Sequence, residues 1–151
     1  MPLPTHIDLQ IVTPDKRLVN EPVDEVEIPG TEGYLGILPG HTPLLASLAV
    51  GELWYRKGQD KTYLSIAFGF VEVLPDRVTI LAQLAERAAD IDVGRAEEAK
   101  KRAEARLAQP RSDMDYERAR VALMKAVARL QVASRLQFAG RVGRAHPGPP
   151  A

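Results

Sequence analysis

The stretch between Gly33 and Leu45 constrains the fold of this chain more than any other, because three glycines and two prolines interrupt its apolar residues. A helix does not tolerate so many interruptions, since proline removes a backbone donor and glycine costs conformational entropy. The pattern predicts a short strand, a tight turn and the start of another strand. No lysine and no helix follow as they do in a phosphate-binding loop, so we interpret the glycines as turn residues.

Strand patterns dominate the first 85 or so residues. Short apolar runs, several of them alternating with polar residues, are separated by turn signals about every ten positions. The connections are too short for parallel crossovers, so we expect mostly antiparallel pairing in a sandwich or barrel. The runs that carry this pattern are 7–11, 25–28, 52–56, 62–67, 70–74 and 78–84.

The period of the apolar residues changes to a helical one near Asp90. From Val93 onward apolar residues, mostly alanine, recur every three or four positions, and a second such stretch ends near Phe138. Asp90 or Asp92 is placed to cap the first helix. We expect two helices of about 16 and 24 residues that form a hairpin. Because alanine buries little area, this hairpin should be only marginally stable by itself.

These patterns give an α+β chain with three parts: an antiparallel β-sandwich module over residues 1–86, a helical hairpin over 87–139, and a disordered tail over 140–151. Residues 1–86 carry 12 acidic and 6 basic side chains, a net charge of −6, whereas residues 87–151 carry 8 and 14, a net charge of +6. The opposite charges favour contact between the two modules, although salt screens exposed pairs at long range.

The residue inventory points away from catalysis. The chain has no cysteine, which excludes disulfides, thiolate nucleophiles and cysteine zinc sites. His6, His41 and His146 are too scattered to hold a metal, and no nucleophile elbow is present. His41 is either a loop histidine bonded to backbone or a partner contact. No apolar run approaches the roughly 20 residues of a membrane span, and no signal-peptide pattern opens the chain, so any membrane association should depend on a partner.

One set of residues is suited to an anion. Asp92 and Arg95 lie where the first helix begins, and free backbone N–H groups at a helix start favour phosphate. Arg102 lies two turns further on, and Lys125 and Arg129 lie one turn apart on the second helix. If the two faces meet, four cations form a cradle for a triphosphate. A solvated helix face with a capping aspartate explains the same residues.

The second helix and the tail are strongly basic. This composition is compatible with nucleic-acid binding, but no aromatic platform is interleaved with the cations, and an acidic protein surface would fit them equally well. The basic residues are Arg118, Arg120, Lys125, Arg129, Arg135, Arg141 and Arg144.

Four segments resemble one known family, the epsilon subunit of bacterial F-type ATP synthases. They are IVTPD at 11–15, GILPGHTPL at 36–44, the strands between 70 and 86, and IDVGRA at 91–96. Their order and spacing match the family over nearly all of the chain before the tail. The resemblance implies a flattened β-sandwich followed by a two-helix domain, and a regulatory rather than catalytic subunit.

The partners that the resemblance implies are the gamma subunit and the ring of c subunits. In the family, the complex is permissive when the hairpin is folded on the sandwich. The resemblance implies that the hairpin, when it extends along gamma, contacts the alpha and beta subunits and blocks ATP hydrolysis. No nucleic-acid partner is expected. Attachment to the membrane would occur only through the complex, at the cytoplasmic side of the cell inner membrane.

The resemblance also implies that ATP is a regulatory ligand of some members, with no required cofactor and no metal. Lys125 lies where nucleotide-binding members can have arginine; it keeps the charge but loses the planar fork. The residues that match the family's ATP pocket are Glu86, Asp92, Arg95, Ala96, Arg102, Lys125 and Arg129.

Contacts with the c ring and gamma are expected at Tyr34, His41 and Pro43. Tyr34 replaces an acidic residue seen in some relatives. A second departure is at 67–70, where this chain has Ala-Phe-Gly-Phe in place of the common Ser-Gly-Gly-Phe.

Overall fold

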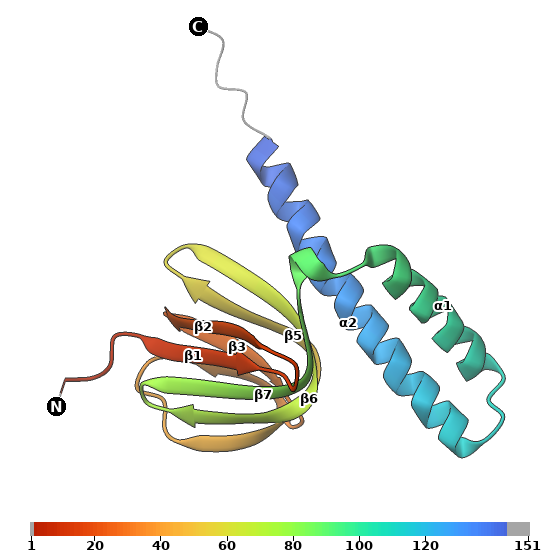
Figure 1. The fold of residues 1–151 in the computed structure, drawn as a ribbon, viewed down its shortest axis with the longest axis horizontal. Coiled ribbons are helices and arrows are strands. Elements are labelled where there is room, and N and C mark those ends of the chain that lie inside the picture. The colour runs from red at the N-terminus through yellow and green to blue at the C-terminus, as the bar shows by residue number, and fades with distance from the viewer. Residues whose placement is uncertain (1, 145–151) are drawn as a thin grey trace, which may run out of the picture.

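The computed structural model describes the backbone of residues 2–144 and the side chains through Leu136. Strands precede two helices, as expected, and there are seven of them (Figure 1). The strands are β1 (Ile7–Val12), β2 (Arg17–Val23), β3 (Glu25–Gly30), β4 (Gly33–Ile37), β5 (Leu44–Lys57), β6 (Asp60–Leu74) and β7 (Arg77–Arg87). A 3-10 turn, η1 (Ala88–Asp90), leads to α1 (Val93–Ala108) and α2 (Asp113–Arg144).

The strands pair in the order β2-β1-β7-β6-β5-β3-β4, and the sheet folds over on itself as a sandwich (Figure 1). All pairs are antiparallel except β1 with β7, which run parallel from the Asp8 and Arg77 pair onward. The prediction of a mostly antiparallel sandwich is therefore confirmed. The parallel pair needs no short crossover, because five other strands lie between β1 and β7 in the chain.

A bend crosses the sheet at Phe68 and Gly69, in the middle of β6. Residues 62–67 and 70–74, which the sequence suggested as two runs, form one strand that changes face at this point: Ile66 before the bend and Val71 after it both point into the core. Phe68 has φ +61° and Gly69 φ +127°. A Cβ on Gly69 would clash with the Leu81 carbonyl oxygen, so only glycine fits there. The left-handed backbone of Phe68 costs about 1–2 kcal/mol.

Aliphatic side chains fill the space between the two layers. The largest fully buried ones are isoleucines, leucines and valines from all seven strands. The residues that the period-2 pattern placed inside the sheet are buried, except Leu84, which is 53% exposed. Such burial stabilises by roughly 1.5–3 kcal/mol per side chain relative to exposure. The list includes Ile7, Leu9, Ile11, Val23, Val26, Ile28, Ile37, Leu48, Leu53, Leu64, Ile66 and Ile80.

The helical hairpin is confirmed, with α2 lying between the sandwich and α1 (Figure 1). Asp92 caps α1, because its Oδ1 accepts the Arg95 N–H at 3.1 Å. Ser112 caps α2, because its Oγ accepts the Asp115 N–H at 3.0 Å. The two helices meet through buried alanines, namely Ala96, Ala103 and Ala119.

The helix α2 continues to Arg144, so the prediction of a disordered tail is wrong for residues 140–144. Gly140 and Gly143 each weaken a helix by about 1 kcal/mol but keep its hydrogen bonds, whereas a proline removes one. The first proline after Pro110 is Pro147. The rest of the predicted tail, with His146, lies outside the described residues. No helix among the described residues is long and apolar enough to cross a membrane.

Candidate functional site

Three cations on α2 connect the hairpin to the outer face of the sandwich. Lys125, Arg129 and Arg135 each reach a group on β5, β6 or β7. We call these contacts the docking contacts. They join the basic hairpin to the acidic sandwich, as the division of charge along the chain suggested.

The contact between Arg135 and Glu52 is bidentate. Arg135 Nε donates to Glu52 Oε2 at 3.0 Å, and a terminal nitrogen donates to Oε1 at 2.8 Å. The Glu52 side chain is only 8% exposed, and the guanidinium also lies 5.0 Å from the centre of the Tyr63 ring. The hydrogen bonds to Glu52 raise the pKa of Arg135 above its ordinary value. Charge-assisted bidentate pairs of this kind are the strong ones.

The contact between Arg129 and Glu86 is less well aligned. A terminal nitrogen of Arg129 donates to Glu86 Oε2 at 3.3 Å. Arg129 Nε lies 2.7 Å from Oε1, yet this buried nitrogen has no hydrogen bond of acceptable angle within the described structure. Both side chains are partly exposed, so this ion pair should contribute less than that of Arg135.

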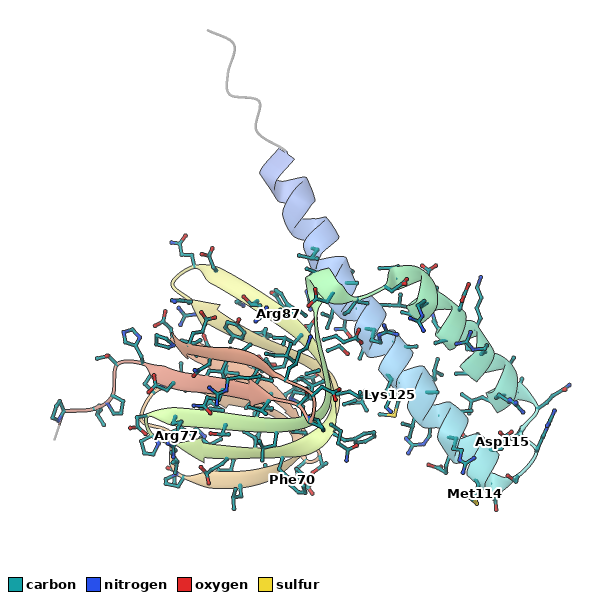
Figure 2. All side chains as sticks on the ribbon, viewed as in Figure 1. Phe70, Arg77, Arg87, Met114, Asp115 and Lys125 are labelled. Atoms are coloured by element: carbon teal, nitrogen blue, oxygen red, sulfur yellow. The ribbon has the colours of Figure 1, made fainter. Side chains whose placement is uncertain are left out.

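Lys125 makes the third docking contact. Its Nζ lies 5.6 Å from the centre of the Phe68 ring, within the range of a cation–π interaction. In Figure 2, Lys125 lies where α2 faces the sandwich. Both side chains are half-buried.

A cavity of about 270 Å³ lies between the sheet and the two helices. Glu86, Lys125 and Arg129 line it on its polar side, while Ala99 and Ala122 contribute much of the helical wall. Its volume is close to the ~300 Å³ at which small-molecule pockets begin. The small alanine side chains leave this space open, so the contact of α2 with the sandwich is not tightly packed.

A second groove of about 340 Å³ runs between α1 and α2 and shares Ala99 and Ala122 with the cavity. Three arginines line it, together with Asp115, which lies 3.9 Å from Arg106. The three are Arg102, Arg106 and Arg118.

The structure separates the residues predicted to bind ATP into three places. Glu86, Lys125 and Arg129 meet at the cavity, and Arg102 lies in the adjoining groove. At the start of α1, Asp92 and Arg95 are exposed and line neither space, while Ala96 is fully buried. Two of the four predicted cations, rather than all four, therefore line the cavity.

The predicted partner contacts lie on β4 and in the loop before β5. Tyr34 is 58% exposed, Pro43 is exposed, and His41 is half-buried. His41 Nδ1–H donates to the Thr42 carbonyl at 2.6 Å, so this histidine bonds to backbone as the simpler interpretation had it. The loop is fixed from the other side by Gly40 N–H, which donates to the Pro75 carbonyl at 2.7 Å.

A further exposed apolar patch crosses the outer face of the sheet. Phe70 on β6 is 64% exposed and pairs with Leu81 on β7, which is 54% exposed. Leu45 on β5 is diagonal to Phe70 and is 75% exposed. We call Leu45, Phe70 and Leu81 the outer apolar patch.

Sequence reasoning missed the roles of Glu52, Tyr63 and Phe68. The signal for Glu52 was an acidic residue inside an apolar strand, where a charge is rarely buried without a partner. Arg135 was recognised only as one basic residue among several. Its partner lies 83 positions away, and no local pattern connects the two.

Two family descriptions match the chain. Residues 6–88 match "ATP synthase, Delta/Epsilon chain, beta-sandwich domain", and residues 89–134 match "ATP synthase, Delta/Epsilon chain, long alpha-helix domain". The ATP synthase epsilon chain of Syntrophobacter fumaroxidans is 53% identical over 129 residues, which are 85% of this chain and 96% of that one. That of Halalkalibacterium halodurans is 47% identical over 134 residues, 88% of this chain and 100% of that one.

A solved ATP synthase structure also contains a chain with a similar fold. A chain in the Euglena gracilis mitochondrial ATP synthase, a structure of OSCP, F1 and the c-ring, superposes with a TM-score of 0.74 at 27% identity, covering 92% of this chain and 84% of that one. The sandwich, the helical hairpin and these relatives together show that the chain belongs to the delta/epsilon family of ATP synthase chains and, within that family, to the epsilon chains.

Proposed function

We propose that this chain joins the gamma subunit to the c ring of a proton-translocating F-type ATP synthase, and that its hairpin restrains ATP hydrolysis. The observation that supports the proposal is the kind of contact that α2 makes with the sandwich. The helix rests on the sandwich through three cationic contacts and one small apolar cluster around Val132, over an incompletely packed seam, rather than through a continuous apolar core. Such a contact is suited to opening and closing, because little buried apolar area must be exposed when the hairpin leaves.

As an epsilon chain, the protein is a non-catalytic stalk component of its complex. The outer apolar patch supports a protein partner on the sandwich, because exposed apolar clusters mark interaction sites. Gamma is the partner we assign to it. The loop with His41 and Pro43, together with Tyr34, is assigned to the c ring, which would hold the chain at the cytoplasmic side of the cell inner membrane.

When the hairpin extends, the cations of α2 become available to other partners. We assign the acidic surfaces of the alpha and beta subunits to this role, because complementary charge steers and orients association. The same arginines that hold the hairpin down would then hold it in the inhibitory position.

Removal of the hairpin tests the inhibition. In the assembled enzyme, a chain that ends after Arg87 should raise ATP hydrolysis and still assemble with gamma. A chain lacking only residues 145–151 is the control, because it keeps the whole of α2. If hydrolysis is the same with and without the hairpin, the inhibitory role is wrong.

A second function, ATP binding by the docked hairpin, is supported by the cavity. Lys125 and Arg129 line it, and Arg129 Nε points at no well-aligned acceptor in the described structure. Phosphate oxygens would supply such acceptors. The cavity is small, so it would hold only part of the nucleotide, with the phosphates at Lys125 and Arg129. Because side chains supply the positive charge, binding should not require a metal.

Calorimetric titration of the intact chain with ATP tests this proposal. Arg129→Ala should weaken binding at least tenfold and Arg95→Ala less, because Arg95 lines neither space. Lys101→Ala, at an exposed position on α1, is the control. Absence of heat at millimolar ATP would rule out the ATP site and leave the stalk role standing.

A further inference from the structure

Phe68 is the one residue other than glycine with a positive φ in the described part of the chain. A glycine would adopt this backbone freely, whereas a side chain here is strained. The strain is not needed to make the bend, because the neighbouring Gly69, with φ +127°, fits its own position only as glycine and would accompany a glycine at 68 equally well. The sandwich alone therefore gives no reason for an aromatic ring at this position.

The ring has a partner across the seam. Lys125 Nζ lies 5.6 Å from its centre, and both side chains are half-buried where α2 meets β6. Within the described structure, Lys125 has no carboxylate within ion-pair distance, in contrast to Arg129 and Arg135. The Phe68 ring is therefore the group that offsets the partial burial of this ammonium. Cation–π interactions become stronger as water is excluded from them.

We propose that Phe68 is a docking residue for the hairpin, which holds Lys125 of α2 over its ring while the sandwich carries the strain of a left-handed phenylalanine. Two effects of opposite sign follow. The ring favours the docked hairpin, and its Cβ disfavours the folded sandwich. This inference concerns the docking equilibrium of the isolated chain, so it stands or falls separately from the inhibition of hydrolysis.

A double-mutant cycle tests the coupling. The chain has no cysteine, so Asp76→Cys and Gln109→Cys, both at exposed positions, place a fluorophore pair on the sandwich and the hairpin without other labelling. We expect Phe68→Leu and Lys125→Met each to raise the undocked fraction about threefold, and the double variant to raise it no further, because both remove one interaction. Phe70→Leu and Lys101→Met are matched controls and should leave the fraction unchanged.

The strain is measured by comparing Phe68→Gly with Phe68→Ala, because both lack the ring and only alanine keeps a Cβ. Trp54, the single tryptophan, lies on β5 and reports the melting of the sandwich. The glycine variant should melt about 3–6 °C above the alanine variant. Independent effects of Phe68→Leu and Lys125→Met that multiply to about ninefold, or no effect of either, would overturn the coupling. Equal melting temperatures would overturn the strain.

Discussion

Fully buried isoleucine, leucine and valine side chains fill the sandwich, whereas α2 presents to it mainly alanines and three cations, with Val132 as its one fully buried valine among the described residues. The first kind of contact is close-packed and is lost only when the domain unfolds. The second has a cavity of about 270 Å³ and depends on two pairs of opposite charge and one cation–π contact. The chain therefore combines a sandwich that has a single stable packing with a helical hairpin whose position depends on a few polar contacts. Mutations and solution conditions should affect these two regions differently.

The largest expected effect is in the sandwich core. Ile66 is fully buried, and Ile66→Ala should lower the free energy of unfolding by about 2–5 kcal/mol. Denaturant unfolding followed by Trp54 fluorescence measures it. Ala126→Gly at the seam of α2 is the comparison and should change sandwich unfolding by less than about 1 kcal/mol. A similar loss from both variants would mean that the two regions share one core.

The next largest effect is expected at the docking contact between Glu52 and Arg135. Glu52→Gln keeps the shape of the side chain but removes the charge that pairs with Arg135, so we expect the undocked fraction to rise about tenfold, or ~1.5 kcal/mol. Hydrogen exchange of the α2 amides in the intact chain measures this change. Glu117→Gln, which removes an exposed pair within α2, should leave docking unchanged. Equal exchange in the two variants would contradict the role of Glu52.

Salt should weaken the docking of the hairpin more than it changes the stability of the sandwich. Raising the salt concentration from about 0.05 M to 0.5 M shortens the screening length severalfold and should raise the undocked fraction about two- to threefold. The effect is limited because Glu52 is nearly buried. Fluorescence transfer across the seam measures docking while Trp54 reports the sandwich. Loss of sandwich stability in parallel would argue against a selective effect on the hairpin.

The smallest effect concerns pH and Asp24, the residue between β2 and β3. The Gly58 N–H bonded to Asp24, with His6 and Arg56 nearby, lowers the pKa of this carboxyl. A lowered pKa in the folded state stabilises above the unfolded value of 3.8, and the benefit disappears as the pH falls through the folded value. Asp24→Asn should therefore melt slightly below the wild type at pH 7 and together with it at pH 2. Docking should not change.

The sequence predicted those parts of the molecule that depend on local pattern. The alternation over 7–11 and 78–84 identified strands with a buried face, except that Leu84 is 53% exposed. Asp92 was recognised as a possible helix cap because its contact is three residues away. The bend at Phe68 was missed because a phenylalanine does not signal a left-handed backbone. The predicted length of α2 was too short because Gly140 and Gly143 were interpreted as part of a disordered tail. Glu52 with Arg135 and Phe68 with Lys125 are tertiary pairs, and only the fold brings them together.

ATP hydrolysis by the assembled enzyme carrying Glu52→Gln is the most direct test of the central claim that the docking contacts hold the hairpin away from the catalytic subunits. The variant should hydrolyse ATP about two- to fivefold more slowly than the wild type, because more of the hairpin is released. In a chain that ends after Arg87 the same substitution should have no effect. An unchanged or faster rate in the full-length variant would contradict the claim.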